Sequence, residues 1–192
     1  VPTSADSDSL ASNLADAGEL VFVLSLAPHE PEPISTGTPK QRKLFPATYY
    51  RTALAWQVQD ILTGVAYVTG RRDVSTVRVV GLRETGIPAL CALALAPADR
   101  LALTILDMNG INDADESAWT GPRAQPTILR VGSLRTAGVL ASSRGGRLVL
   151  HNTQGRLDAQ VLRQATRAAE RESALSISEA ALDLEHIRQA LR

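Results

Sequence analysis

The chain has 192 residues, of which 44% are hydrophobic and 21% are charged, shares typical of a soluble globular domain with a sizeable core. The 20 Lys and Arg residues balance 20 Asp and Glu residues, and this zero net charge argues against an electrostatic nucleic-acid binder. No apolar run reaches the roughly 20 residues that a membrane-spanning helix needs. The single cysteine, Cys91, excludes an internal disulfide and a multi-thiolate zinc site.

The N-terminal part of the chain predicts a helix, a strand and a long loop. Residues 1–9 are small and polar, so we expect no signal peptide within the chain. The pattern of residues 10–17 predicts a short helix that ends at Gly18. Residues 19–27 (ELVFVLSLA) form an almost continuous apolar run, which is typical of a strand buried on both faces. Residues 28–47 hold five prolines and no periodicity, and they predict a long loop.

The rest of the chain alternates helix and strand signals. Thr48 is expected to cap a helix whose apolar stripe runs at helical spacing to Gly70. Further strands are expected at residues 77–82, 101–108, 147–151 and 175–177, and helices at 87–96, 127–142, 158–172 and 184–191. This alternation predicts an α/β fold with a doubly wound, mostly parallel sheet of five strands in one domain over residues 1–192, with residues 77–82 central.

The segment over residues 77–95 (VRVVGLRETGIPALCALAL) predicts a sharp turn from a buried strand into a helix. Such turns make functional sites, because the helix N-terminus offers free N–H groups and the positive end of a dipole. Gly81 and Gly86 have the spacing of a phosphate-binding P-loop. However, Ile87 and Pro88 stand where that motif needs Lys and Ser or Thr, so this route to nucleotide binding is excluded.

The identity of Arg83 distinguishes between two other functions of such a turn, dinucleotide binding and nucleophilic catalysis. Its bulk stands at the middle glycine of a dinucleotide fingerprint, which excludes close approach of a pyrophosphate. The turn also fits the nucleophile elbow G-x-S-x-G of α/β-hydrolases, with Gly81 as the first glycine. In that pattern Arg83 replaces the serine and Thr85 replaces the second glycine, so the elbow architecture is expected without its nucleophile.

Several segments together resemble a bacterial branch of the acetylxylan-esterase-like α/β-hydrolases. The segments VVGLRETGIPAL, TILDMNGIND and RLVLHNTQG look like the elbow, the next strand and the strand after it. Residues 49–51, with Leu54 and residues 58–62, resemble the helix before the elbow. The resemblance covers roughly residues 10–192 and corresponds to the C-terminal half of the fold. In that branch a glycine-containing turn often replaces the serine motif.

The resemblance implies a set of site residues and partners. Family order places the triad-equivalent positions at Arg83, Asp158 and His186, and the first oxyanion N–H at Glu84. It implies a carbohydrate or ester ligand, an extracellular or periplasmic location, and an N-terminal half of the fold in the same chain or a partner chain. No cofactor, metal, nucleic acid or membrane partner is expected.

Simpler structural roles compete with each of these assignments. Asp158 is favoured as a helix N-cap, and His186 as a surface residue of an amphipathic helix. Arg83 can form a salt bridge with Glu84 or bind a ligand carboxylate at the ends of the strands. Cys91 is expected to be a small buried hydrophobic residue. Other singled-out residues are Asp113, Asp115 and Glu116, which are expected in a solvated loop. His151 is expected to end a strand and satisfy nearby backbone groups, and His29 lies in the long loop without a visible partner.

The leading hypothesis is an esterase-like α/β-hydrolase domain that has lost its serine nucleophile and acts as a binding module. The alternatives are an active ester hydrolase with non-standard or upstream catalytic residues, and a structural module of a larger protein. The substrate class rests on fold analogy alone.

Overall fold

A four-stranded, fully parallel sheet forms the centre of the computed structural model, which describes residues 4–26, 51–120, 123–125 and 127–191. The strands lie in the order β1 (Val77–Gly81), β2 (Leu101–Asp107), β3 (Arg147–His151) and β4 (Leu175–Ile177). The connections between them contain α4 (Gly86–Leu93), α5 (Ser133–Arg144) and α6 (Ala159–Ala168). The α/β class expected from the alternating pattern is therefore confirmed, with four parallel strands within the described residues.

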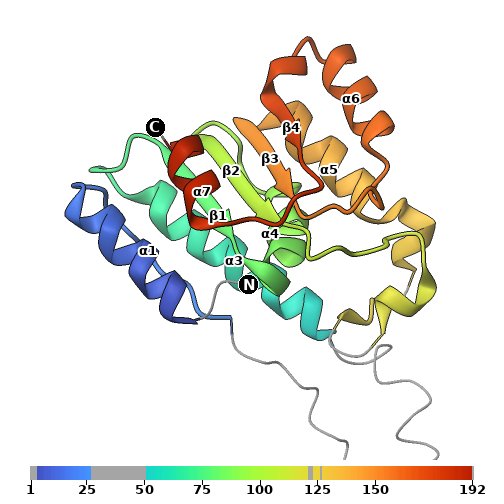
Figure 1. Cartoon of the computed structure of the whole chain (residues 1–192), viewed down its shortest axis with the longest axis horizontal. Coiled ribbons are helices and arrows are strands. Elements are labelled where there is room, and N and C mark those ends of the chain that lie inside the picture. The colour runs from blue at the N-terminus through green and yellow to red at the C-terminus, as the bar shows by residue number, and fades with distance from the viewer. Residues whose placement is uncertain (1–3, 27–50, 121–122, 126, 192) are drawn as a thin grey trace, which may run out of the picture.

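Helices cover both faces of the sheet (Figure 1). The larger apolar core joins the crossover helices and α3 (Ala53–Gly70) to one face of the sheet through residues such as Leu106, Leu148 and Leu150. The smaller core joins α1 (Ser4–Asp16) and α7 (Leu184–Leu191) to Leu103, Ile105 and Val149 on the opposite face. Successive strand residues thus enter opposite cores, as the alternation of side chains along a strand requires.

The strand order differs from the expected doubly wound arrangement. The strands follow one another in sequence order, without the reversal that marks a doubly wound sheet. Right-handed crossovers that advance in one direction place their helices on one face, which is why α4, α5 and α6 contribute to the same core. Strand β1 pairs only with β2 and so lies at an edge of the described sheet, in contrast to the central position expected for residues 77–82.

The apolar run at residues 19–26 is not a strand, contrary to the prediction. This segment, here called the edge strap, follows α1, and its Glu19 carboxylate lies 2.8 Å from the Arg78 guanidinium of β1. The Phe22 ring lies 5.7 Å from the Tyr67 ring of α3. Leu20 and Val23 remain 65% and 63% exposed. A hydrophobic run indicates burial but carries no information about a pairing partner, and none of the described strands pairs with this segment in the sheet.

Several element boundaries differ from the predicted ones for local reasons. The side chain of Thr52 caps α3 by accepting from the Ala55 N–H, whereas Thr48 and the loop at residues 28–47 lie outside the described residues. The helix expected over 127–142 is divided at Gly132, whose φ of 88° is left-handed. Short 3-10 helices are η2 (Arg83–Thr85), η3 (Glu116–Trp119), η5 (Ile128–Val131) and η6 (Glu172–Ala174). Among the described helices, none combines the length and the apolar character that crossing a lipid bilayer requires.

Candidate functional site at the carboxyl edge of the sheet

The carboxyl ends of the strands form a rim of strained, hydrogen-bonded turns. Arg83, Asn109 and Asn152 follow β1, β2 and β3, and their φ values are 52°, 51° and 56°. Arginine rarely adopts this left-handed region, which costs about 1 to 2 kcal/mol and is concentrated at functional sites, whereas asparagine tolerates it because its side chain can hydrogen-bond locally. The left-handed Arg83 and the turns that meet beside it make this edge the candidate site.

The turn after β1 brings α4 into close contact with the sheet. A Cβ on Gly81 would lie 2.9 Å from the Leu106 side chain and 3.1 Å from the Cα of Gly86. A Cβ on Gly86 would overlap the backbone carbonyl of Asp107. Helix α4 thus approaches β1 and β2 so closely that both positions require glycine. Thr85 replaces the usual second glycine without conflict, because its backbone is right-handed and its hydroxyl donates to the Leu82 carbonyl at 2.7 Å.

Arg83, the residue that the family resemblance aligns with the nucleophile, adopts a left-handed φ of 52°. Its side chain is partly exposed, and among the described residues its guanidinium forms no ion pair or hydrogen bond. The salt bridge expected between Arg83 and the exposed Glu84 is therefore absent from this part of the chain. A guanidinium is a permanent cation with five N–H donors, and it suits a carboxylate or a carbonyl oxygen but cannot attack an acyl group.

The ends of β2 and β3 are joined by a network around Asp107. Its Oδ1 accepts from the Asn109 backbone N–H and from the Asn152 side-chain amide, both at 2.8 Å. Gln154 donates in turn to the Asn152 side chain at 3.2 Å. Asp107 is only 5% exposed, so its carboxylate is a structural acceptor that holds the two turns together.

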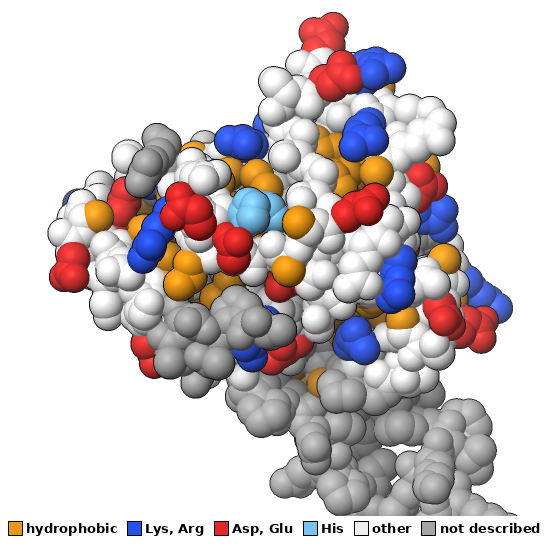
Figure 2. Space-filling model, in the orientation of Figure 1, with side chains coloured by type: hydrophobic (Ala, Val, Ile, Leu, Met, Phe, Trp, Pro, Cys, Tyr) orange, Lys and Arg blue, Asp and Glu red, His pale blue; other side chains and the backbone are white. Residues whose placement is uncertain are grey.

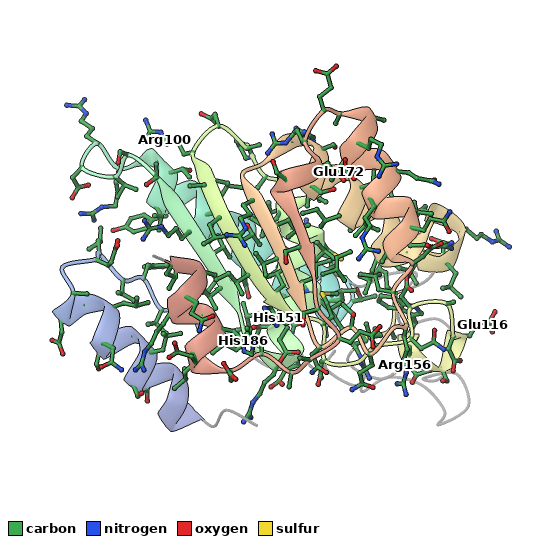
Figure 3. The ribbon with its side chains drawn as sticks, turned by 45° about the horizontal axis from the view of Figure 1, so that its top comes forward. Arg100, Glu116, His151, Arg156, Glu172 and His186 are labelled. Carbon is green, nitrogen blue, oxygen red and sulfur yellow. The ribbon has the colours of Figure 1, made fainter. Side chains whose placement is uncertain are left out.

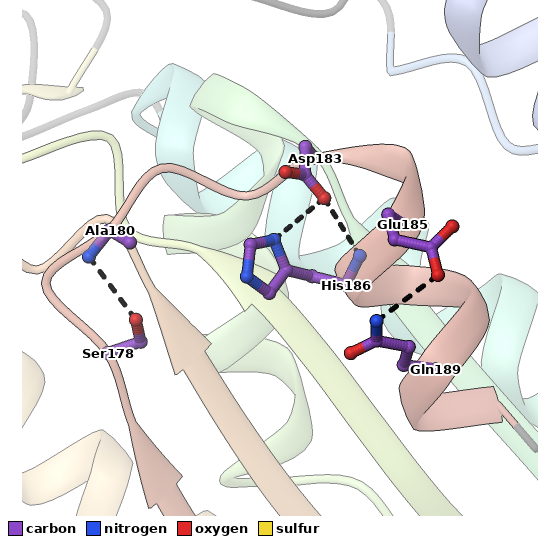
Figure 4. Close-up of polar contacts among 6 residues, drawn as sticks. All are labelled: Ser178, Ala180, Asp183, Glu185, His186 and Gln189. Carbon is purple, nitrogen blue, oxygen red and sulfur yellow. Dashed lines mark hydrogen bonds and ion pairs between the residues drawn. The ribbon is translucent and has the colours of Figure 1, made fainter.

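His186 contacts an acid that differs from the one implied by family order. The His186 Nδ1 lies 2.7 Å from Oδ1 of Asp183, which also accepts the His186 backbone N–H at 2.8 Å (Figure 4). Asp183 therefore begins α7 and orients the imidazole at the same time. The hydrogen bond from the His186 backbone N–H, with a smaller contribution from the His186 ring, holds the pKa of the Asp183 carboxyl below its usual range. Such an arrangement fixes the proton on Nδ1 and leaves Nε2 as the acceptor of a general base.

His151 lies beside this pair. The rings of His151 and His186 approach to 5.0 Å between their centroids, and both side chains meet at the strand ends (Figure 3). His151 is 6% exposed, and its Nδ1 is buried without a partner among the described residues. Burial is the main cause that lowers the pKa of His151, and the charge of His186 adds to it. The neutral form of this imidazole is therefore favoured in the folded protein. In surface view, a histidine is visible on this face of the molecule beside acidic side chains (Figure 2).

Asp158 is placed away from the His186 contact. It caps α6 by accepting the Val161 N–H at 3.3 Å, and its other oxygen lies 3.9 Å from Arg135. The N-cap interpretation is confirmed. Sequence reasoning missed Asp183, although an acid three residues before His186 at a helix start was a readable capping signal.

The remaining candidate residues lie outside the rim or outside the described chain. Asp115 and Glu116 are exposed as expected, but Asp113 is 2% exposed, which corrects the prediction of a solvated loop there. Burial raises the pKa of the Asp113 carboxyl, and the Ser133 hydroxyl at the start of α5 donates to the Asp113 backbone carbonyl at 3.1 Å. Desolvation also raises the pKa of the Cys91 thiol to about 11, which opposes a nucleophilic role. His29 lies outside the described residues.

Within the described part of the chain, no three His, Cys, Asp or Glu side chains form a metal-binding group. Comparison with protein-family models, with curated proteins and with solved structures finds no match for this chain.

Proposed function

We propose that this chain is an esterase-like α/β-hydrolase domain that has lost its serine nucleophile and binds a carbohydrate ligand carrying a carboxylate or an ester. One observation supports the proposal: a cation, Arg83, stands at a left-handed position in a tight strand-to-helix turn between Gly81 and Gly86. The relation to the acetylxylan-esterase-like proteins supplies the carbohydrate class and is part of the proposal.

Two features support binding rather than serine chemistry. The Arg83 guanidinium is partly exposed at the carboxyl edge of the parallel sheet, beside the turns that follow β2 and β3. The serines near α5 cannot substitute for the nucleophile. Ser133 and Ser142 are 4% and 0% exposed, and Ser143 donates to the Leu140 carbonyl within α5.

Binding can be tested with xylo-oligosaccharides that carry either acetyl or uronic acid groups, observed by saturation-transfer NMR. We expect the uronic-acid oligosaccharide to bind with a Kd on the order of 1 mM, because a single exposed guanidinium contributes only a few kcal/mol. Arg83→Gln should weaken binding about tenfold. Arg163→Gln removes the same charge from an exposed position on α6 and should leave binding unchanged. Equal effects of the two substitutions, or no binding at all, would overturn the proposal.

Loss of the nucleophile can be tested separately with an active-site phosphonate that labels activated serines. We expect no labelling, because no described serine lies in the elbow turn. Stoichiometric labelling of one serine would contradict this expectation and show that serine chemistry is retained.

The contact between Asp183 and His186 favours a second candidate, an ester hydrolase with non-standard catalytic groups. With its Nδ1 held 2.7 Å from the carboxylate, His186 is oriented to activate a water molecule through Nε2. If this candidate is correct, the protein should hydrolyse p-nitrophenyl acetate slowly, and the rate should fall about 100-fold in His186→Gln. The phosphonate should leave this rate unchanged. The binding proposal expects no hydrolysis above that of the free imidazole side chain.

A further inference from the structure

Helix α7 covers the face of the sheet opposite the crossover helices. Its Ile187 is fully buried, and so is Leu182 just before the helix; both pack against Leu103, Ile105 and Val149. In Figure 1 this helix, in dark red, lies in front of β1 and is the last element of the chain. The helix has eight residues, so its position depends on these tertiary contacts rather than on its intrinsic stability.

Two histidines meet where α7 begins. His151, at the end of β3, is held by the sheet, and His186 belongs to the first turn of α7. Their ring centroids are 5.0 Å apart, at an interplanar angle of 57°. The buried Nδ1 of His151 has no hydrogen-bond partner among the described residues, so no described neighbour would accept a hydrogen bond from a proton on this nitrogen. A proton added to His151 would therefore place a charge in a buried site beside the imidazole of His186.

We propose that the His151–His186 pair is an acid-sensitive latch, which holds α7 on the sheet while His151 is neutral and releases it when His151 takes up a proton. Release exposes the apolar face formed by Leu103, Ile105 and Val149 while the larger core on the opposite face stays intact. This inference is independent of the proposed function, because it requires neither a ligand nor Arg83.

The charged groups around His151 shift its pKa in opposite directions, and the sum of these influences determines whether the pKa rises or falls. His186 from α7 disfavours the imidazolium, whereas Asp107 from β2, Asp183 before α7 and the Ala180 backbone favour it. Desolvation is the largest influence, and the net result is a lowered pKa. Between its folded pKa and the unfolded value of about 6.5, the unfolded state binds more protons, so stability falls as pH falls through this window. Asp183, whose pKa is also lowered, contributes stability that is lost only below about pH 4.

The latch can be tested by hydrogen exchange of the α7 amides, corrected for the pH dependence of intrinsic exchange. Between about pH 7.5 and pH 5 we expect protection of α7 to fall at least tenfold, while β2 and β3 keep theirs. His151→Gln should abolish the change because the position no longer titrates. His186→Gln should shift it to higher pH, because it removes the positive charge that opposes protonation of His151. His29→Gln is the matched control and should behave as the native chain does.

An NMR titration of the His151 ring in the native protein gives a second readout that needs no variant. Its midpoint should coincide with the loss of α7 protection. The proposal is wrong if α7 protection does not change over this range, if β2 and β3 open in parallel with it, or if the two midpoints differ by more than about one pH unit.

Discussion

Arg83 and the glycines around it show how tightly single positions constrain the turn after β1. Gly81 and Gly86 have no room for a Cβ, and Arg83 adopts a left-handed φ of 52° that costs about 1 to 2 kcal/mol. Glycine at position 83 would adopt this conformation without strain. Arginine stands there instead and has no ionic partner among the described residues. We therefore propose that its role is to bind a ligand and not to stabilise the fold.

Gly86→Ala should destabilise the fold by about 3 kcal/mol, because the new methyl group would overlap the backbone of Asp107, which cannot give way. Gly70→Ala is the matched control. Nothing lies within 4 Å of its Cβ position at the end of α3, so a stabilisation of about 0.5 to 1 kcal/mol is expected. Urea denaturation measures both changes. Equal midpoints for the two variants would show that the close approach of α4 to β2 is absent in solution.

Arg83→Ser should not create an efficient esterase. A serine nucleophile needs a base within about 3 Å and an oxyanion hole with two donors. The chain offers the Glu84 N–H for one donor, and family order places the second donor in the N-terminal half of the fold. Stopped-flow kinetics with p-nitrophenyl acetate should therefore show no acyl-enzyme burst. A burst that His186→Ala abolishes would mean that the catalytic frame is complete.

Among the elements, the starts of α6 and α7 look alike in the sequence but have different surroundings. Each begins with an aspartate that accepts a backbone N–H three residues later, Asp158 from Val161 and Asp183 from His186. Only Asp183 also contacts an imidazole, and its helix lies over the smaller core. The same capping signal therefore serves a purely structural role in α6 and a candidate acid–base pair in α7.

Asp158→Ala should lower the free energy of unfolding by about 1 kcal/mol, the usual effect of losing an N-cap, and should leave ligand binding unchanged. Asp183→Ala should cost a similar amount in capping and also release the His186 ring, so the Nδ1 signal of His186 should move in NMR spectra. If Asp158→Ala instead weakened binding or hydrolysis, the assignment of Asp158 from family order would regain support.

The whole molecule has one sheet edge with a strongly apolar segment beside it. Strand β1 has no described partner on its outer side, and the edge strap leaves Leu20, Phe22, Val23 and Leu24 exposed. Open edges and exposed apolar patches promote association. We therefore keep the proposal that the fold is completed beyond β1, by further strands of a longer chain or by a partner chain.

The chain alone should associate at micromolar concentrations in sedimentation velocity experiments, because the edge strap is exposed. Replacing Leu20 and Val23 with Lys should raise the monomer fraction without loss of stability, since both side chains are already more than half exposed. Leu106→Lys is the contrasting case and should unfold the domain, because that side chain is fully buried. A native chain that stays monomeric at high concentration would contradict this expectation.

Local signals in the sequence determined the strands β1 to β4, the helices between them and the need for Gly81 and Gly86 at the turn. These features depend on hydrophobic periodicity, helix caps and backbone sterics, which act over a few residues. The same signals failed at residues 19–26, where apolar character predicted a strand but pairing depends on a partner distant in sequence. They also missed the division of α5 from η5 at Gly132.

Only the tertiary structure decided which groups meet at the carboxyl edge. The parallel register sets Asp107 beside His151, and the packing of α7 brings His186 to the same place. Family order supplied Asp158 for the acid position, but the chain path after β4 brings Asp183 to His186 instead. Side chains that are distant in sequence become neighbours through strand pairing and core packing, and a single sequence does not encode these long-range contacts as a local pattern.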